Sequence, residues 1–438
     1  MPVRQRKKIQ EVLRRVIGLR ALYQALFVLG LVLGLPWFLF RMTHSKRFRA
    51  GLWQRLGLSP PPRRQEVGPC LWVHGVSVGE VMAARGVVEQ FQARHPDWVV
   101  AVSSTTLEGF GLARRIFPAT SVFYFPLDLR MAVRRTFGAV VPTAVVLMEL
   151  ELWPMFLAEA HRRSCPVILV NGRITGKSFR GYRRIQRMLP QFDLITAVGA
   201  QNTEYADRFT SLGVPSARVS VTGNVKIDAA AAGLGCVSEW PGTGPPDDRP
   251  WLVAGSTHEG EEQIIGRAAG DCWRLICAPR HPERAKDAEM ALRVAGRRVI
   301  RISALRSGAP CPPGADVLLD TIGDLQAAYT LASAAFVGGS LVPHGGQNVL
   351  EPAGCGIPVV VGPHTGNFAY EVSLLESAGG LHRVETQSAL SAVLDGWISE
   401  PGLLVSQGRA ARKAVEAHTG ACERNLIVIE EALADAGL

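Results

Sequence analysis

The chain has 438 residues, of which 47% are hydrophobic and 20% charged, and its formal net charge is +10. This length predicts two domains rather than one core, and the composition excludes disorder throughout the chain. The positive charge lies at one end, because residues 1–64 contain fourteen Lys and Arg against one acid, Glu11. The rest of the chain is slightly acidic, which argues against nucleic acid as a partner.

That basic end contains an uncharged stretch, "ALYQALFVLGLVLGLPWFLF", at residues 21–40. Twenty apolar residues are about the length that crosses a bilayer. A cleaved signal peptide is the rival interpretation, but the stretch is long and no small-x-small cleavage site follows it. We therefore expect residues 1–45 to form a basic N-terminus with a membrane-anchor helix, which either crosses the bilayer or inserts into its surface. The flanking cations suit anionic lipid headgroups.

Beyond the anchor, short apolar runs alternate with amphipathic segments. The runs before residue 229 are "CLWVHGVS", "WVVAVSST", "SVFYFP", "AVVLMEL", "PVILVNGR" and "LITAVG". This alternation is typical of a parallel sheet with helices on both faces. We expect an N-terminal Rossmann-like domain over residues 46–240, ending in the Ala-, Gly- and Pro-rich stretch 229–250.

A second alternating series follows, with "WLVAGST", "RLICAPR", "RRVIRIS", "DVLLDT", "ASAAFVGGS" and "IPVVVGP". It predicts a C-terminal Rossmann-like domain over residues 241–438, whose last helix could pack back on the N-terminal domain. Two doubly wound α/β domains facing a cleft would bind ligands at the carboxyl ends of their strands.

Several polar residues directly follow predicted strands of the first domain. Glu80 follows "LWVHGVSVG", Glu149 and Glu151 follow "AVVLM", and Lys226 follows "VSVTGNV". An acid at a helix start, such as Glu80, can be merely a favourable charge near the helix dipole. The alternative hypothesis is that these side chains carry the chemistry.

In the second domain the segment "HGGQNVLEP" joins a Gly-rich loop to a helix expected near Val349. Glycines let backbone amides approach a phosphate, and Glu351 in the first turn could bind a ribose diol. An ordinary turn with a first-turn acid is the alternative. No G-x-x-x-x-G-K-[ST] motif supports a P-loop ATPase.

Metal and disulfide chemistry is not expected. Eight cysteines are scattered without a C-x-x-C pair, and the histidines lack an H-E-x-x-H pattern. Buried thiols in a reducing cytosol are the simplest interpretation of the cysteines.

Eight motifs together resemble the 3-deoxy-D-manno-octulosonic acid (Kdo) transferases of lipopolysaccharide biosynthesis. They occur in order over roughly residues 35–370: "HGVSVGE", "MELELWP", "NGRITGKSFRGY", "VTGNVKID", "GSTHEGEE", "APRHPER", "FVGGSLVPHGGQNVLEPA" and "GPHTGNF". The resemblance implies the GT-B fold, with two Rossmann-like domains. Leu150 stands where the family often has Thr, so a hydroxyl group beside Glu149 is missing from this chain.

The resemblance also implies roles for individual residues. Glu80 matches the family's general base, and Glu149 and Lys226 match positions assigned to transition-state stabilisation. The matches to contacts with the CMP of the donor are Pro279, Arg280, Ile322, Gly323, Asp324, Asn348, Val349, Leu350 and Glu351.

By the same resemblance, the expected activity is inverting transfer of one or more Kdo residues from CMP-Kdo to lipid IVA. Lipid IVA is the tetraacyldisaccharide 1,4'-bisphosphate precursor of lipid A. CMP-Kdo is a substrate, so no cofactor and no metal ion are expected. Membrane lipids are expected partners, with the catalytic domains on the cytoplasmic side of the cell inner membrane, held by one N-terminal anchor. The alternatives are a membrane-associated GT-B transferase that uses a UDP-sugar, and a catalytically silent nucleotide-binding protein.

Overall fold

The computed structural model describes residues 3–44, 49–62, 68–117, 121–186, 191–232 and 248–438. Within these ranges the chain forms two compact units, residues 1–225 with 420–438, and residues 226–419. Residues 233–247, the centre of the expected Ala-, Gly- and Pro-rich boundary, lie outside the described part. Each unit is an α/β domain with one parallel sheet, as the alternation of apolar runs predicted.

The first unit contains a seven-stranded parallel sheet in the order β3-β2-β1-β4-β5-β6-β7. Its strands are β1 (Cys70–His74), β2 (Val99–Ser104), β3 (Ser121–Tyr124), β4 (Ala144–Met148), β5 (Val167–Gly172), β6 (Ala197–Ala200) and β7 (Val219–Val221). Alternate residues of β1 enter different cores: Trp72 packs with Phe137 and Phe156, whereas Leu71 and Val73 pack on the opposite face. Both faces are therefore buried, as in other all-parallel sheets.

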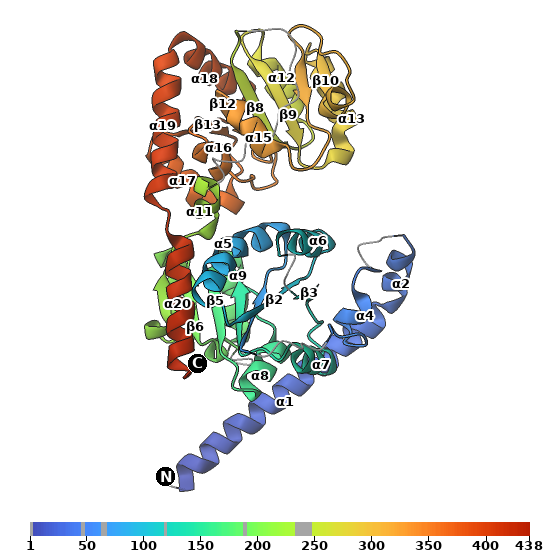
Figure 1. Ribbon diagram of the computed structural model, residues 1–438, viewed down its shortest axis with the longest axis vertical. Coiled ribbons are helices and arrows are strands. Elements are labelled where there is room, and N and C mark those ends of the chain that lie inside the picture. Colours follow the sequence, from blue (N-terminus) through green and yellow to red (C-terminus); the bar gives the residue numbers. More distant parts are fainter. Residues whose placement is uncertain (1–2, 45–48, 63–67, 118–120, 187–190, 233–247) are drawn as a thin grey trace. The chain divides into compact units, whose positions relative to one another are not determined.

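Helices cover both faces of this sheet (Figure 1). They are α5 (Val78–Arg94), α6 (Leu107–Ile116), α7 (Arg130–Val140), α8 (Pro154–Arg162), α9 (Gly176–Ile185), α10 (Thr203–Ser211) and α20 (Ala421–Asp435), with the short α4 (Leu52–Arg55) before the sheet. The last helix, α20, belongs to the first unit through Asn425, whose side-chain oxygen accepts hydrogen bonds from Asn171 N–H and the Thr222 hydroxyl, both at 3.1 Å.

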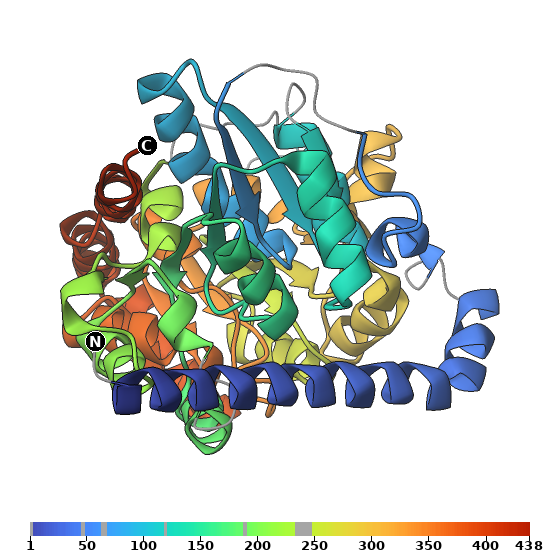
Figure 2. The ribbon, with the colours of Figure 1, turned by 90° about the horizontal axis from the view of Figure 1, so that it is seen from below.

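Two helices precede the sheet, α1 (Val3–Leu33) and α2 (Leu35–His44). Figure 2 shows α1 as one long straight helix followed by a turn into α2. The uncharged stretch 21–40 is thus divided between two helices at Gly34, where Pro36 lacks the N–H that would continue α1. Within the described ranges, no helix combines the length and apolarity needed to span a bilayer, so the expected anchor helix over 21–40 is not shown.

The second unit contains another seven-stranded parallel sheet, in the order β10-β11-β9-β8-β12-β13-β14. Its strands are β8 (Trp251–Thr257), β9 (Arg274–Pro279), β10 (Val299–Arg301), β11 (Asp316–Leu318), β12 (Ala334–Val337), β13 (Val359–Val361) and β14 (Leu381–Arg383). Its helices are α11 (Val225–Ala232, which starts at the border), α12 (Glu261–Ala269), α13 (Ala285–Val294), α14 (Ile302–Arg306), α15 (Leu325–Leu331), α16 (Leu350–Gly354), α17 (Ala369–Ser377), α18 (Gln387–Ser399) and α19 (Pro401–Ala417).

Residues of β8 alternate between two cores in the same way. Leu252 and Ala254 pack with Trp273 and Trp397, whereas Val253 packs with Tyr329 on the other face. The large buried side chains therefore position the sheet, and the polar residues of the sequence motifs are left for the loops at its carboxyl edge.

Candidate active-site residues at the strand ends

The order of strands reverses once in the first sheet, between β1 and β4. In doubly wound folds the loops that follow the two strands at this point separate, and they leave a crevice where ligands bind. Glu80 follows β1, and Glu149 and Glu151 follow β4. These residues, which were predicted because they follow strands, therefore lie on both sides of the crevice expected between β1 and β4.

Glu80 lies in the first turn of α5 and takes part in its N-terminal cap. The Val76 N–H donates to Glu80 Oε2 at 2.8 Å, and the Ser77 hydroxyl donates to Glu80 Oε1 at 3.0 Å. Ser77 is the N-cap residue and in turn accepts a hydrogen bond from Glu80 N–H at 3.4 Å. This reciprocal arrangement is a variant of the capping box in which the carboxylate accepts from the N–H of the residue before the N-cap, so both carboxylate oxygens of Glu80 are positioned by the turn that follows β1.

Glu149 adopts a positive φ of 57°, a conformation that non-glycine residues seldom occupy. Its N–H donates to Val170 O at 3.0 Å, which continues the pairing of β4 with β5 for one more residue. The backbone then turns away from the strand direction at this residue. Such local strain clusters at functional sites, and here it lies directly after β4, two residues before Glu151.

The carboxyl group of Glu151 has a strongly perturbed pKa. Burial, followed by the negative charges of Glu80 and Glu149, raises the pKa of Glu151 to about 7. Trp153 Nε1 donates to Glu151 Oε2 at 3.0 Å and partly offsets that rise. The charges of Glu80 and Glu149 act on Glu151, so both of these carboxyl groups lie in its neighbourhood. Glu151 was noted in the sequence because it follows a strand, but no role was predicted for it. Its perturbed pKa depends on burial, and a position after a strand does not reveal burial.

Lys226 is the second residue of α11, and the chain just before it is tied to the first sheet. The Asn171 side-chain oxygen accepts a hydrogen bond from Val225 N–H at 3.2 Å. Asn171, at the end of β5, itself adopts a positive φ of 54°. Asn171 is therefore a positioning residue for the start of α11, whereas the expected function of Lys226 stays a prediction.

In the second sheet the strand order reverses between β8 and β12. The buried carboxylate of Glu261 joins the loops on either side of this point. It accepts hydrogen bonds from His258 N–H at 2.8 Å and Gly339 N–H at 2.7 Å through Oε2, and from Ser340 N–H at 3.0 Å and Leu341 N–H at 2.9 Å through Oε1. Glu261 was not predicted as a functional residue from the sequence. Its position inside the "GSTHEGEE" motif was the feature that could have indicated it.

Three histidines gather at this edge of the second sheet. The ring of His258 stacks on that of His344, with 4.1 Å between centroids, and His281 approaches it edge-on at 6.3 Å. Burial and the neighbouring cationic side chains lower the pKa of His258 to about 4, so its ring is neutral at pH 7. Its Nε2 atom is buried and has no hydrogen-bond partner in the described part of the chain, which marks it as a group that a ligand could satisfy.

The Gly-rich loop between β12 and α16 is held in place by its own hydrogen bonds. Gly345 and Gly346 have φ values of 85° and 79°, which favour glycine. Gly346 N–H donates to Gly339 O at 2.8 Å, and the Asn367 side chain donates to His344 O at 3.0 Å. Because α16 has only five residues, any phosphate at this loop would depend on the loop amides more than on a helix dipole.

Asn348 and Glu351 are brought together at the start of α16. Asn348 Nδ2 donates to Glu351 Oε1 at 2.9 Å, while Asn348 Oδ1 accepts from Leu350 N–H at 3.1 Å. Burial raises the pKa of Glu351. Val349 and Leu350 lie in the core, so their side chains cannot reach a ligand and only their backbone atoms could contribute contacts.

The other expected nucleotide contacts lie after β9 and β11. Pro279 ends β9, and Arg280 N–H donates to Thr257 O at 2.9 Å. The Asp324 carboxylate forms an ion pair with Arg306 at 2.5 Å and accepts a hydrogen bond from the Thr321 hydroxyl, and these contacts lower its pKa. The carboxylate of Asp324 therefore fixes the turn at 321–324, which presents Gly323 and the 90% exposed side chain of Ile322.

The two parallel sheets, each with polar groups at its reversal point, define a protein of two Rossmann-like α/β domains that resembles GT-B glycosyltransferases. UDP-GlcNAc 2-epimerase from Neisseria meningitidis, bound to UDP-GlcNAc, has a similar fold, with a TM-score of 0.58. It is 15% identical and the match covers 84% of this chain and 100% of the epimerase. At this identity the likeness concerns the fold alone.

Sequence comparison gives the family. Residues 50–229 match the family model described as 3-Deoxy-D-manno-octulosonic-acid transferase (kdotransferase). The chain is 31% identical to the 3-deoxy-D-manno-octulosonic acid transferase of Haemophilus influenzae, over 88% of this chain and 92% of that protein. It is 33% identical to the enzyme of the same name from Bordetella pertussis, over 89% and 95%. The chain belongs to the Kdo transferase family and is a glycosyltransferase.

Removing the carboxylate of Glu261 should destabilise the second unit. We expect Glu261→Ala to lower the free energy of unfolding by about 3 kcal/mol or more, because four N–H groups lose their acceptor and buried donors without a partner cost about 1–3 kcal/mol each. Urea denaturation followed by far-UV circular dichroism measures this loss. The matched control is Glu259→Ala, an exposed acid two residues away, and equal stability losses in the two variants would contradict the role of Glu261.

The acidic cluster predicts a titration near neutral pH. As pH rises from 4.5 towards 7, Glu151 keeps its proton in the folded state and loses it in the unfolded state, so this group makes folding less favourable with rising pH. Trp153 reports the change through its hydrogen bond. We expect tryptophan emission to titrate near pH 7, Glu80→Gln to shift the midpoint to lower pH, and Glu151→Gln to abolish it.

Trp153→Phe is the control that assigns this signal, because it removes the reporter and leaves the carboxyl groups. An unchanged midpoint in Glu80→Gln would show that Glu80 and Glu151 are not electrostatically coupled.

Proposed function

We propose that this Kdo transferase moves Kdo from CMP-Kdo to lipid IVA with inversion at the anomeric carbon, and that Glu80 is the general base. Kdo transfer in lipopolysaccharide core assembly follows from membership of the family. The donor, the acceptor and the residue roles are the proposal. The observation that carries it is the carboxyl cluster of Glu80, Glu149 and Glu151 at the reversal point of the first sheet.

The reaction requires one proton transfer and one displacement. An acceptor hydroxyl gives its proton to the carboxylate of Glu80 as its oxygen bonds to the anomeric carbon of Kdo. The bond from that carbon to the phosphate oxygen breaks, and CMP leaves with the electron pair. Such base catalysis contributes about 10²–10⁴-fold. A single displacement needs no enzyme nucleophile. The carboxyl groups are therefore proposed to act as a base and as electrostatic partners, and none of them as a nucleophile.

The capping box suits Glu80 to this role. Its two hydrogen bonds restrict the carboxylate to one orientation, which a base requires for alignment with the hydroxyl. Glu149 and Lys226 are proposed to stabilise the transition state. Glu151, with a pKa near 7, is partly protonated at neutral pH, so the cluster does not accumulate three full negative charges beside the substrate.

The second unit is proposed to bind the CMP of the donor. The Asn348–Glu351 pair offers a carboxylate to the ribose hydroxyls, and Arg280 with the amides of the Gly-rich loop would neutralise the phosphate. The exposed side chain of Ile322 beside Gly323 offers an apolar surface to the base. Pro279 and Val349 to Leu350 complete the proposed contacts through backbone atoms.

Membrane association is proposed to occur at the cytoplasmic face of the inner membrane, through the N-terminal helices. Large apolar side chains of α1 and α2 are exposed to solvent, including Leu26 at 58%, Leu33 at 72% and Trp37 at 59%. Basic residues flank this surface on both sides in the sequence. Apolar side chains flanked by cations are the combination that binds an anionic lipid surface.

The proposed activity is tested by mass spectrometry of the products formed from CMP-Kdo and tetraacyldisaccharide 1,4'-bisphosphate. A product heavier by one or more Kdo residues supports it. The same assay with CMP or UDP as competitor identifies the nucleotide, and we expect inhibition by CMP. Inhibition by UDP alone, with no Kdo product, would favour a UDP-sugar transferase.

Replacing Glu80 by glutamine separates its role as base from its role as cap. The amide oxygen can still accept the Val76 hydrogen bond but cannot take the hydroxyl proton. We expect Glu80→Gln to lower kcat by about 10²–10⁴-fold while CMP affinity, measured by calorimetry, stays close to that of the wild type. Glu108→Gln, a first-turn acid on the neighbouring helix α6, is the control, and a Glu80→Gln enzyme with normal turnover would rule out the base assignment.

Replacing Glu351 should affect the donor site alone. We expect Glu351→Ala to weaken CMP binding by about tenfold or more, because a hydrogen bond to a charged group contributes about 1.5–3 kcal/mol. Calorimetric titration with CMP and with cytosine measures the change, and only CMP, which contains the ribose and phosphate, should be affected. Wild-type affinity for CMP in this variant would contradict a ribose contact.

A further inference from the structure

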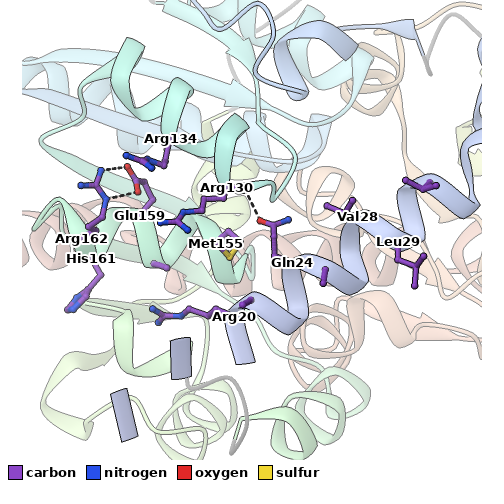
Figure 3. Close-up of a pocket in the computed structure, with 14 residues that line it drawn as sticks. Arg20, Gln24, Val28, Leu29, Arg130, Arg134, Met155, Glu159, His161 and Arg162 are labelled. Carbon is purple, nitrogen blue, oxygen red and sulfur yellow. Dashed lines mark hydrogen bonds and ion pairs between the residues drawn. The ribbon is translucent and has the colours of Figure 1, made fainter. Parts of the chain in front are cut away.

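A large groove in the first unit lies between α1, α7 and α8 (Figure 3). Its volume is about 1030 Å³, at the upper end of the range of about 300–1,000 Å³ typical of ligand pockets. One face of α1 forms one wall, and residues of α7 and α8 form the other. None of the strand-end residues discussed above lines the groove, so it is a separate feature of the molecule.

The groove is defined by specific contacts between α1 and the sheet domain. The Gln24 side-chain oxygen accepts a hydrogen bond from Arg130 N–H at 2.8 Å. Tyr23 hydrogen-bonds to Asp128, a buried residue whose carboxylate caps α8 by accepting from Met155 N–H at 3.0 Å and Phe156 N–H at 2.9 Å. These bonds fix α1 against the first turns of both α7 and α8.

The wall formed by α1 is apolar but remains exposed to solvent. Val28, Leu29 and Val32 line the groove, yet 43%, 51% and 58% of their surface is accessible. The small side chains of Ala25 and Ala158 face the same space and keep it open. Exposed apolar surface in a concave site favours an apolar ligand, because its burial releases water.

The other end of the groove is cationic. Figure 3 shows Arg134, Arg130 and Arg20 spread along the side of the groove away from Val28 and Leu29. None of these three arginines has a carboxylate partner among the side chains that the structure describes, whereas Arg162, also in the lining, is paired with Glu159 at 2.6 Å. Their charges are therefore free to attract an anion.

Two of these arginines destabilise the helix that carries them. Arg130 is the first residue of α7, where the helix dipole disfavours positive charge, and Arg134 is one turn further on the same side. Nearby, Gln24 Nε2 is buried and has no hydrogen-bond partner in the described part of the chain. An anionic group with oxygen acceptors would offset both costs.

We propose that this groove binds one acyl chain of an anionic bilayer phospholipid, with the lipid phosphate at Arg20, Arg130 and Arg134 and the chain along Ala25, Val28 and Val32. The separation of cationic and apolar ends matches the two parts of such a lipid. α1 also carries exposed Leu22, Leu26 and Leu33, which do not line the groove, and such apolar surface is suited to contact with the bilayer that would supply the lipid. The inference does not depend on the proposed catalytic residues.

The test uses the full-length protein and monomyristoyl phosphatidylglycerol, with monomyristoyl phosphatidylcholine as the zwitterionic comparison, in calorimetric titrations below micelle formation. We expect saturable binding of one phosphatidylglycerol per chain. Ala158→Trp, which fills the groove, should weaken this binding by about tenfold or more, because the indole would occupy space that the acyl chain needs. Leu26→Trp, on the exposed side of α1, should bind as the wild type does.

A second pair of variants tests the charge. Arg134→Gln should reduce the preference for phosphatidylglycerol over phosphatidylcholine, whereas Arg114→Gln, an exposed arginine on α6, should leave it unchanged.

Wild-type binding by both Ala158→Trp and Arg134→Gln would overturn the proposal, as would the absence of saturable binding. Displacement of the probe by tetraacyldisaccharide bisphosphate but not by phosphatidylglycerol vesicles would also overturn it, since the occupant would then be the acceptor. In each variant, normal Kdo transfer to a soluble acceptor without acyl chains shows that the catalytic function is intact.

Discussion

The reversal of strand order within each sheet is the constraint on which the placement of the functional residues depends. At that point, between β1 and β4 and between β8 and β12, two neighbouring loops leave the sheet in opposite directions. The core takes the apolar residues of the strands, so the polar residues that follow them must emerge at one edge. Glu80 and Glu149 emerge there in the first unit, and His258 and the Gly-rich loop in the second.

The two edges are built with opposite electrostatic character. The first gathers three carboxyl groups, and their mutual repulsion together with burial is what raises the pKa of Glu151. In the second, the buried carboxylate of Glu261 accepts hydrogen bonds from four backbone N–H groups, and Arg280 and the loop amides are the groups proposed for the donor phosphate. The proposed proton abstraction and phosphate binding would need these two environments, and separate units of this chain contain them.

Much of this arrangement was predictable from sequence, because it depends on alternation and on position after a strand. The two parallel sheets follow from the apolar runs, and the expected family from motifs such as "HGVSVGE", and both are confirmed. The burial of individual side chains and their partners were not predictable, because both depend on contacts between residues distant in the sequence. Examples are the perturbed pKa of Glu151, the ion pair of Asp324 with Arg306, and the role of Glu261. The division of residues 21–40 between two helices was also not predictable, because hydropathy alone does not indicate where a helix ends.

In Glu80 the observed structural role is compatible with the proposed chemical role. A capping box needs a carboxylate whose oxygens face the turn before the helix, and in a doubly wound sheet that turn is at the ligand edge. The hydrogen bonds from Val76 and Ser77 hold the side chain without burying it completely. The cap therefore restricts the orientation of the carboxylate in the absence of substrate, and a base that is already oriented loses less conformational entropy when the acceptor hydroxyl binds.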